Sequence, residues 1–379
     1  MDFFLDKQDT HWKDFMRQRK NSLTNRNINE ISKILHLTEE EKQNLEENSK
    51  IVKIRLTPHL LKLIKETQEK GIFALKRQFL NVYKTIDEIP KEQWDNTQNI
   101  EENLPVKNAQ NKYNNSRIIT RLTGSCTSFC GFCYEAIRTL KGNGTSHLNF
   151  NDFKKLCNYI EENPQIDEII FSGGEPLLLT NKILEKYFKE VRNIKRETPL
   201  LIRIHTRELT FNPYRFDKDF INLCNKYQIN GIGLHVTHPS EFTSIFKEKV
   251  KKLKEKNPYI NLHLNTPLLK GINDKYDTLK KLIIEARNLG IEPRYIYHTM
   301  PETPSKETFY VPIQKAIKLL EKFSINISSS MRPRFVIAPN DGKFEPSLYG
   351  NRNFEYINKG TGIRYSNRKG EEKEYNDPT

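Results

Sequence analysis

RIITRLTGSCTSFCGFCYEAIR (residues 117–138) joins a β-rich run to a loop that holds three of the chain's five cysteines. Cys126, Cys130 and Cys133 follow the spacing Cys-x3-Cys-x2-Cys. Thiolates bind iron–sulfur clusters or zinc, and glycines in the loop let it bend three of them toward one point. The same spacing could place the cysteines on one helix face, but the Gly, Ser and Thr residues among them favour a loop. We therefore predict that these cysteines are metal or redox ligands.

The sequence downstream of this stretch alternates β-rich runs with amphipathic segments. The runs cover 117–122, 167–173, 200–206, 231–236, 261–269, 293–299 and 332–338, and the amphipathic segments lie near 150–162, 181–193, 216–227, 241–256, 274–289 and 311–323. Strand followed by helix, repeated about six times, predicts a parallel sheet. Such a sheet can curl into a full or partial (β/α) barrel, so the predicted fold class is α/β.

Residue types that bind ligands or take part in catalysis gather at the ends of these runs. Parallel barrels carry their active sites at the C-terminal ends of their strands. Beyond the cysteine loop, the residues at these ends are Ser172, Gly173, Gly174, Glu175, His205, Thr206, Arg207, His235, His238 and Asn265. The sequence therefore predicts one site on one face of the barrel.

The flanking regions differ from the barrel. Residues 1–110 are expected to form an N-terminal helical extension followed by a polar linker, and residues 111–345 the barrel. Residues 346–379 are expected to form a C-terminal extension with a disordered tail. In the N-terminal part, helices are predicted over 27–36, 38–50 and 57–70, the second opened by a capping box of Thr38 and Glu41.

Composition limits the classes of partner. The net charge of +14 (62 Lys and Arg against 48 Asp and Glu) would suit an anionic partner. Runs such as 247–257, however, alternate lysines with apolar positions as solvated helix faces do, so nucleic acid is not favoured. The sequence contains no apolar run near the length of a membrane span and no signal-peptide pattern, and its cysteine count is odd. We expect a cytoplasmic protein without disulfides, in which Cys157 and Cys224 are core residues.

The cysteine motif, with Phe132 before its last cysteine and Ser172-Gly173-Gly174-Glu175-Pro176 one unit later, resembles the radical S-adenosylmethionine superfamily. The resemblance implies a [4Fe–4S] cluster on three cysteines, whose free iron binds S-adenosylmethionine. An external one-electron reductant would then drive cleavage to a 5′-deoxyadenosyl radical that abstracts a substrate hydrogen. Gly173 and Gly174 would let the backbone meet the methionyl ammonium, and Glu175 would add an acceptor. Further implied contacts to S-adenosylmethionine are His205, His235 or His238, and Asn265.

Longer segments narrow the resemblance. TRLTGSC, EIIFSGGEPLLL, RIHTREL, LHVTHPSEF, LNTPLLKGIND and the tail RNFEYINKGTGIRYSN, in this order, resemble the lysine 2,3-aminomutase family. This implies pyridoxal 5′-phosphate, with Lys343 as the catalytic lysine that forms the internal aldimine and lets the amino group move to the adjacent carbon. The implied phosphate ligands are Arg117 and Arg207 beside Thr206, with Lys112 a further candidate. The family commonly forms oligomers, so a homo-oligomer is expected.

Three positions depart from the lysine-specific pattern of that family. Glu135 stands where the relatives have an arginine for the substrate carboxylate, and Met300 and Ile337 stand where two aspartates bind the distal ammonium. A buried carboxylate facing the substrate carboxylate would cost several kcal/mol, so L-lysine in the usual pose is not expected. Arg138 or Arg294 could supply a replacement cation, or Glu135 could bind a second ammonium or guanidinium group.

The leading hypothesis is therefore a radical, pyridoxal-phosphate-dependent aminomutase acting on a free amino acid other than lysine. Two alternatives remain. One is a radical enzyme that modifies a side group of a protein or RNA, favoured by the net charge of +14 and the altered substrate positions. The other is a scaffold that keeps the cluster without catalysis.

Overall fold

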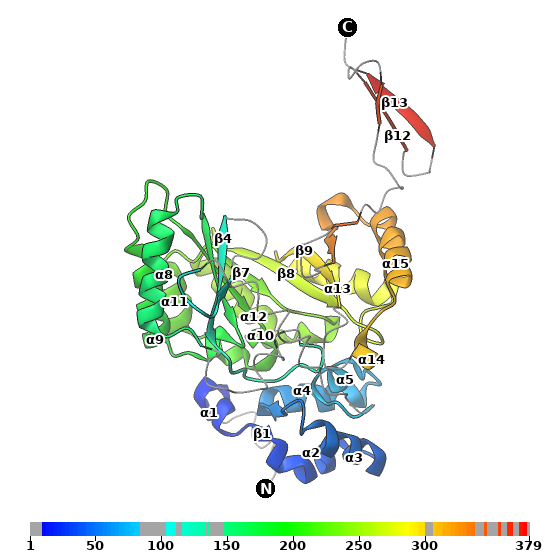
Figure 1. Ribbon diagram of the computed structural model, residues 1–379. Coiled ribbons are helices and arrows are strands. Elements are labelled where there is room, and N and C mark those ends of the chain that lie inside the picture. The colour runs from blue at the N-terminus through cyan, green and yellow to red at the C-terminus, as the bar shows by residue number, and fades with distance from the viewer. Residues whose placement is uncertain are drawn as a thin grey trace.

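An eight-stranded sheet curved into an open barrel organises the chain (Figure 1). The computed structural model describes residues 10–83, 104–110, 116–133, 135, 147–299, 306–337, 345–346, 355–357, 362–366 and 371–376. The strands are β3 (Ala109–Gln110), β4 (Arg117–Thr123), β5 (Glu168–Gly173), β6 (Leu201–Thr206), β7 (Gly231–Leu234), β8 (Asn261–Leu268), β9 (Glu292–His298) and β10 (Arg334–Val336).

Strands β4 to β10 are all parallel and lie side by side in sequence order. Within the described residues no pairing joins β10 to β3, so the barrel is partial. This confirms the predicted α/β class and the parallel sheet. The prediction of a polar linker at the end of residues 1–110 is wrong at one point, because Ala109 and Gln110 form β3, which is antiparallel to β4, and both residues are buried.

Six helices cover the outside of the barrel and confirm the amphipathic segments read from the sequence. They are α8 (Phe150–Glu162), α9 (Asn181–Arg192), α11 (Lys218–Lys226), α12 (Ser244–Lys256), α13 (Tyr276–Asn288) and α15 (Ile313–Asn326). Each buries its apolar stripe against the outward face of the sheet, as Phe153 and Phe188 do against Phe171 of β5. Cys157 and Cys224 are buried in this core, as predicted.

Alternation along β4 divides its side chains between two environments. Ile118 and Leu122 belong to the core beneath the helices. Successive side chains of a strand point to opposite faces, so Arg117, Ile119 and Arg121 point into the barrel interior. The interior side of the sheet is therefore unusually polar for a buried surface.

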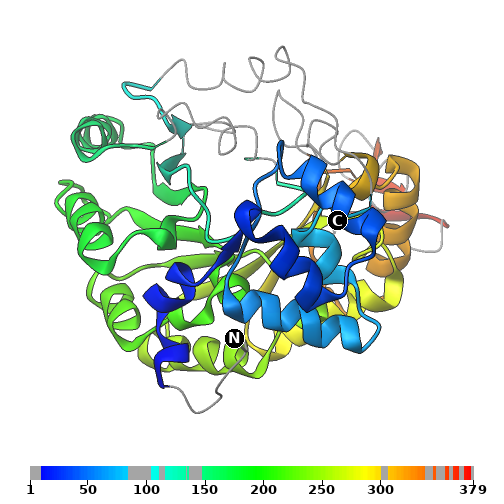
Figure 2. The same cartoon turned by 90° about the horizontal axis from the view of Figure 1, so that it is seen from below.

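The N-terminal helices form a layer across one end of the barrel (Figure 2). They are α1 (Phe15–Lys20), α2 (Ile28–Leu35), α3 (Glu39–Asn48), α4 (Pro58–Glu69) and α5 (Ala74–Phe79), with a short pair of strands, β1 (Leu23–Thr24) and β2 (Arg55–Leu56). The predicted capping box of Thr38 and Glu41 is present. The apolar core of this layer includes Phe211 from the barrel, so the layer is packed onto the barrel rather than tethered to it.

The C-terminal extension contains an antiparallel sheet of β11 (Glu355–Ile357), β12 (Gly362–Ser366) and β13 (Glu372–Asn376), which stands away from the barrel in Figure 1. The prediction of a disordered tail is therefore wrong for residues 372–376. Their backbone groups pair with those of β12, a partner that the composition of the tail does not reveal. None of the described helices has both the length and the apolar composition to cross a bilayer.

Candidate functional site

The three cysteines lie in the loop that follows β4, and the N-terminal layer braces this loop. Arg55 donates a hydrogen bond to the Cys126 carbonyl (2.8 Å), and the Gly131 N–H donates to the Gln78 carbonyl (2.8 Å). All three thiols are free of disulfides. Burial raises the pKa of Cys126 well above its usual value, and the neighbouring thiols of Cys133 and Cys130 add to the shift.

The donor set of this loop fits an iron–sulfur cluster. All three cysteines belong to one short loop, and the charges of the Cys133 and Cys130 thiolates both act on Cys126. Iron binds thiolates, so binding of a cluster would release the protons of these thiols. In the described part of the chain, no three His, Cys, Asp or Glu side chains surround the position of a single metal ion.

The glycine-rich loop after β5 lies directly against the cysteine loop. The Gly174 N–H donates to the Thr123 carbonyl (2.7 Å), and the Glu175 N–H donates to the Ser125 carbonyl (2.8 Å). Gly173 has a φ of +116°, which side chains rarely tolerate, and a Cβ on Gly174 would lie 2.3 Å from the Ser125 oxygen. The glycines are needed for this close approach of two backbones.

Glu175 is committed to internal contacts. Its carboxylate accepts hydrogen bonds from the Thr206 hydroxyl (2.7 Å), the Arg207 N–H (2.9 Å) and the Leu177 N–H (3.1 Å). Burial raises its pKa to about 7, although these hydrogen bonds oppose the shift. Thr206 and Glu175 therefore tie the end of β6 to the glycine-rich loop.

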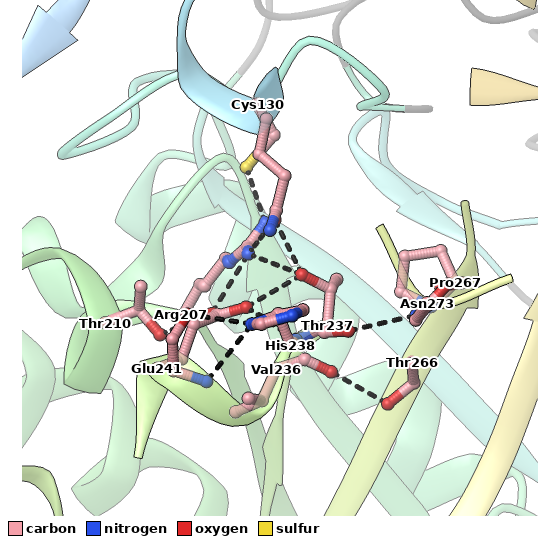
Figure 3. A network of polar contacts seen from close by, with 12 residues as sticks. Cys130, Arg207, Thr210, Val236, Thr237, His238, Glu241, Thr266, Pro267 and Asn273 are labelled. Atoms are coloured by element: carbon pink, nitrogen blue, oxygen red, sulfur yellow. Dashed lines mark hydrogen bonds and ion pairs between the residues drawn. The ribbon is translucent and has the colours of Figure 1, made fainter. Parts of the chain in front are cut away.

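Arg207 occupies the centre of a buried polar network (Figure 3). Its Nη1 donates to the sulfur of Cys130 (3.1 Å), and its Nη2 contacts Thr237 Oγ1 (3.2 Å) and Glu241 Oε2 (3.0 Å) as well as Gln78. Burial raises the pKa of the Cys130 thiol, and the Arg207 cation opposes this shift. The side chain of Arg207 thus forms part of the surroundings of the cysteine loop.

Farther inside the barrel, imidazole and amide groups pack closely against Gly233 of β7. A Cβ on Gly233 would meet His205, Asn265 and His263, all at 2.9 Å or less. Buried atoms without a hydrogen-bond partner among the described residues include His235 Nε2 and Asn265 Oδ1. Burial, followed by Arg207, lowers the pKa of His235 to about 4, so its ring is neutral near pH 7.

These groups fit the polar edges of a nucleoside such as that of S-adenosylmethionine, because buried polar atoms require partners. Of the two histidines that the sequence left as alternatives, His235 approaches His205, with ring centroids 5.5 Å apart. His238 instead accepts a hydrogen bond from the Ser240 N–H through Nδ1 (3.2 Å) and caps a short helix. The geometry favours His235 as the ligand-facing residue.

The opposite, N-terminal end of the barrel has a cavity of about 420 Å³ lined by arginines. The arginines are Arg117, Arg203, Arg294, Arg332 and Arg334, accompanied by Glu168 and Glu292. Glu168 pairs with Arg203, and Glu292 with Arg294 at 2.9 Å. The cavity therefore keeps an excess of positive charge and fits a phosphate or carboxylate group.

The structure separates the two arginines that the resemblance assigned to one phosphate. Arg117 is level with Leu201 across the sheet, and Arg207 lies six residues beyond Leu201. At about 3.3 Å per residue the two side chains start about 20 Å apart. Arg117 lines the arginine cavity, where a phosphate could bind. The assignment of Arg207 to the same phosphate is wrong, because its guanidinium group contacts Cys130 and Glu241 at the other end of the barrel.

The substrate positions are partly described. Glu135 forms an ion pair with Arg121 at 3.2 Å, with Arg121 only 4% exposed. Arg294 is not near this pair, since it lies in the cavity at the other end of the barrel. Ile337 follows β10 and is packed against the core beneath the helices. Arg138, Met300, Lys112 and Lys343 lie outside the described residues.

The sequence reasoning missed several members of the site. Arg121 could have been found, because it shares the inward face of β4 with Arg117. Gln78, Thr237 and Glu241 carry no local signal, since they meet Arg207 from distant parts of the chain.

Comparisons with known proteins show the family to which the chain belongs. The model of the radical SAM superfamily matches residues 120–310. An L-lysine 2,3-aminomutase of Fusobacterium nucleatum is 27% identical over 349 residues, covering 91% of this chain and 79% of that protein. An L-lysine 2,3-aminomutase of Clostridium subterminale is 25% identical over 92% of this chain and 80% of its own. A glutamate 2,3-aminomutase of Clostridioides difficile is 27% identical over 89% of this chain and 77% of its own.

Proposed function

Since the chain belongs to the radical SAM superfamily and is similar to lysine and glutamate 2,3-aminomutases along most of its length, we propose that it is an amino acid aminomutase that uses pyridoxal phosphate. The enzyme would move the amino group of a free amino acid to the adjacent carbon. The observation that carries the proposal is the pairing of a cysteine loop at one end of the barrel with an arginine cavity at the other.

At the C-terminal ends of the strands, Cys126, Cys130 and Cys133 would hold the cluster. A [4Fe–4S] cluster with three protein ligands supplies an open iron for S-adenosylmethionine and the electron, taken from an external reductant, that starts hydrogen abstraction. Gly174 keeps the backbone close to this loop, and His235 and Asn265 offer their free polar atoms to the nucleoside. The N-terminal layer contacts this loop through Arg55 and Gln78 and would help to keep it in place around a cluster.

At the N-terminal end of the barrel, Arg117 and the neighbouring arginines would hold the phosphate of pyridoxal phosphate. Arginine suits a dianionic phosphate because it donates two parallel hydrogen bonds, and several arginines share the cavity. Pyridoxal phosphate supplies the group through which an amino group can migrate between neighbouring carbons. Lys343, which follows β10 in the sequence, is our proposed attachment residue.

The Arg121–Glu135 pair supports a substrate with its carboxylate at Arg121. Glu135 already has a cationic partner, so a second ammonium or guanidinium group of the substrate would have to displace Arg121. Arg121 also lies on the inward face of β4, where its positive charge would attract a substrate carboxylate. Arg121 would thus replace the arginine that lysine-specific relatives carry at position 135.

The remaining substrate-reading positions favour an amino acid without a distal cation. Met300 is apolar and cannot pair with an ammonium group. Ile337 is apolar too and packs against the core beneath the helices, so it offers no partner to such a group either. We therefore place lysine outside the substrate range and expect a side chain without a distal cation.

Turnover of individual amino acids tests this proposal. The reconstituted enzyme, with S-adenosylmethionine, pyridoxal phosphate and dithionite, should convert an α-amino acid without a distal cation into its β-isomer, and Lys343→Ala should abolish the conversion. Cleavage of S-adenosylmethionine without conversion of any amino acid would contradict the aminomutase proposal and favour a macromolecular substrate. Failure of cleavage with the cluster present would favour the scaffold.

A further inference from the structure

Arg207 places a buried cation on one of the three cysteine sulfurs. It follows the last residue of β6, and its Nη1 lies 3.1 Å from Cys130 Sγ (Figure 3). Its Nη2 is shared by Glu241 (3.0 Å) and the Thr237 hydroxyl (3.2 Å). The guanidinium group therefore bridges a prospective cluster ligand and a buried carboxylate.

Aromatic rings enclose this cation. The guanidinium carbon lies 4.8 Å from the ring centre of Phe79, 5.3 Å from that of Phe132 and 5.7 Å from that of Phe211. Arg207 is 7% exposed and Glu241 is fully buried. Charges in such surroundings are poorly screened by water and salt, so both act strongly on the neighbouring sulfur.

Residues from three parts of the chain hold the orientation of Arg207. Gln78 comes from α5 of the N-terminal layer and also accepts a hydrogen bond from Thr237 (2.6 Å). Glu241 further accepts from the Thr210 hydroxyl (2.8 Å) and from the Thr237 N–H (2.9 Å). The cation can neither turn away from Cys130 nor exchange Glu241 for water.

We propose that Arg207 is a positioning residue that raises the reduction potential of the cluster, and that Glu241 limits this rise. One electron from an external low-potential donor adds one negative charge to the cluster. An N–H donor and a positive charge at a cysteine sulfur stabilise the reduced state, whereas a carboxylate behind the cation stabilises the oxidised state. The inference needs a cluster on the three cysteines and does not depend on pyridoxal phosphate or on the substrate.

A redox titration of four variants, monitored by electron paramagnetic resonance, tests it. The full chain is reconstituted anaerobically with iron and sulfide alone and titrated with dithionite in the presence of mediators. The variants are Arg207→Met, Arg207→Lys, Glu241→Gln and the double variant Arg207→Met/Glu241→Gln. The double variant removes both buried charges, so it does not leave Glu241 unpaired in the interior.

The signs of the shifts decide the outcome. Arg207→Met should lower the ratio of reduced to oxidised cluster at a fixed potential about tenfold, which is about 59 mV for one electron. The double variant, which also removes the carboxylate, should lower this ratio less. Glu241→Gln should raise this ratio, and Arg207→Lys, which keeps the charge, should stay near wild type.

Equal potentials in all variants, or shifts of the same sign for Arg207→Met and Glu241→Gln, would overturn the proposal. A purely structural role would lower the amount of cluster bound without these opposite shifts. If Arg207→Met does not hold a cluster, the shift of Glu241→Gln decides alone. Because the titration contains no amino acid, its result is separate from the test of the aminomutase.

Discussion

Replacing Gly174 by alanine should separate the glycine-rich loop after β5 from the cysteine loop after β4. The new Cβ would lie 2.3 Å from the Ser125 oxygen and 2.7 Å from the Ser125 carbonyl carbon, where ordinary contacts begin at 3.4 Å. Both atoms are backbone, so a side-chain rotation cannot relieve the clash. The loops must part by about 1 Å, a change that costs about 1–3 kcal/mol of stability as overpacking does.

The separation should affect catalysis more than cluster binding. Gly174→Ala leaves all three cysteines in place, so iron content and cluster absorbance should remain. A displacement of about 1 Å at a positioning group costs about 100-fold in rate. We therefore expect reductive cleavage of S-adenosylmethionine, measured as 5′-deoxyadenosine formed with dithionite, to fall about 100-fold.

Gly231→Ala is the matched control, because its Cβ would come no closer than 3.3 Å to any neighbour, the Asn261 oxygen. It lies on β7 in the same barrel interior and should keep the wild-type rate of cleavage. A Gly174→Ala variant that cleaves S-adenosylmethionine as fast as Gly231→Ala would refute the argument that these two backbones must touch.

Three further predictions follow from buried groups. Arg121→Met should raise the KM for the amino acid while leaving cleavage of S-adenosylmethionine unchanged, and Glu135→Gln should have a smaller effect; an unchanged KM would remove Arg121 from substrate binding. Burial, followed by the charge of a neighbouring carboxylate, raises the pKa of Glu208, so the folded apoprotein binds more protons than the unfolded chain, and its free energy of unfolding should fall from pH 5 to pH 8. Glu208→Gln should reduce that fall in denaturant titrations without removing it, because the pKa of Glu175 is also raised, to about 7; an equal fall in the variant would assign it to other groups. Cys126→Ser should lose the cluster absorbance, whereas Cys157→Ser should keep it and lose about 1–3 kcal/mol of stability through a buried hydroxyl; loss of the cluster in both would contradict the assignment of ligands.

Local patterns were sufficient to predict the strands and helices of the barrel. Alternating β-rich runs and amphipathic segments correspond to β4 through β10 and their covering helices, because burial of one face imposes its period on the sequence. The order of residue types at the strand ends likewise predicted where the polar groups would gather. These features depend on neighbours only a few residues apart.

Long-range pairings account for what the sequence could not predict. Gln78 and Glu241 meet at Arg207 although they come from the N-terminal layer and the loop after β7, and neither position has a local signature. The resemblance assigned Arg207 to the phosphate because motif order does not show how far Arg207 lies from Arg117 along the sheet. The composition of residues 372–376 predicts disorder because it does not reveal their partner strand β12.

The most direct test of the proposed function is the absorption spectrum of the protein after anaerobic reconstitution with iron, sulfide and pyridoxal phosphate. Wild type should show the absorbance of a cluster together with a pyridoxal band that disappears in Lys343→Ala, while the cluster absorbance stays in both. A cluster spectrum without any Lys343-dependent band would contradict the use of pyridoxal phosphate, and with it the proposed migration of an amino group.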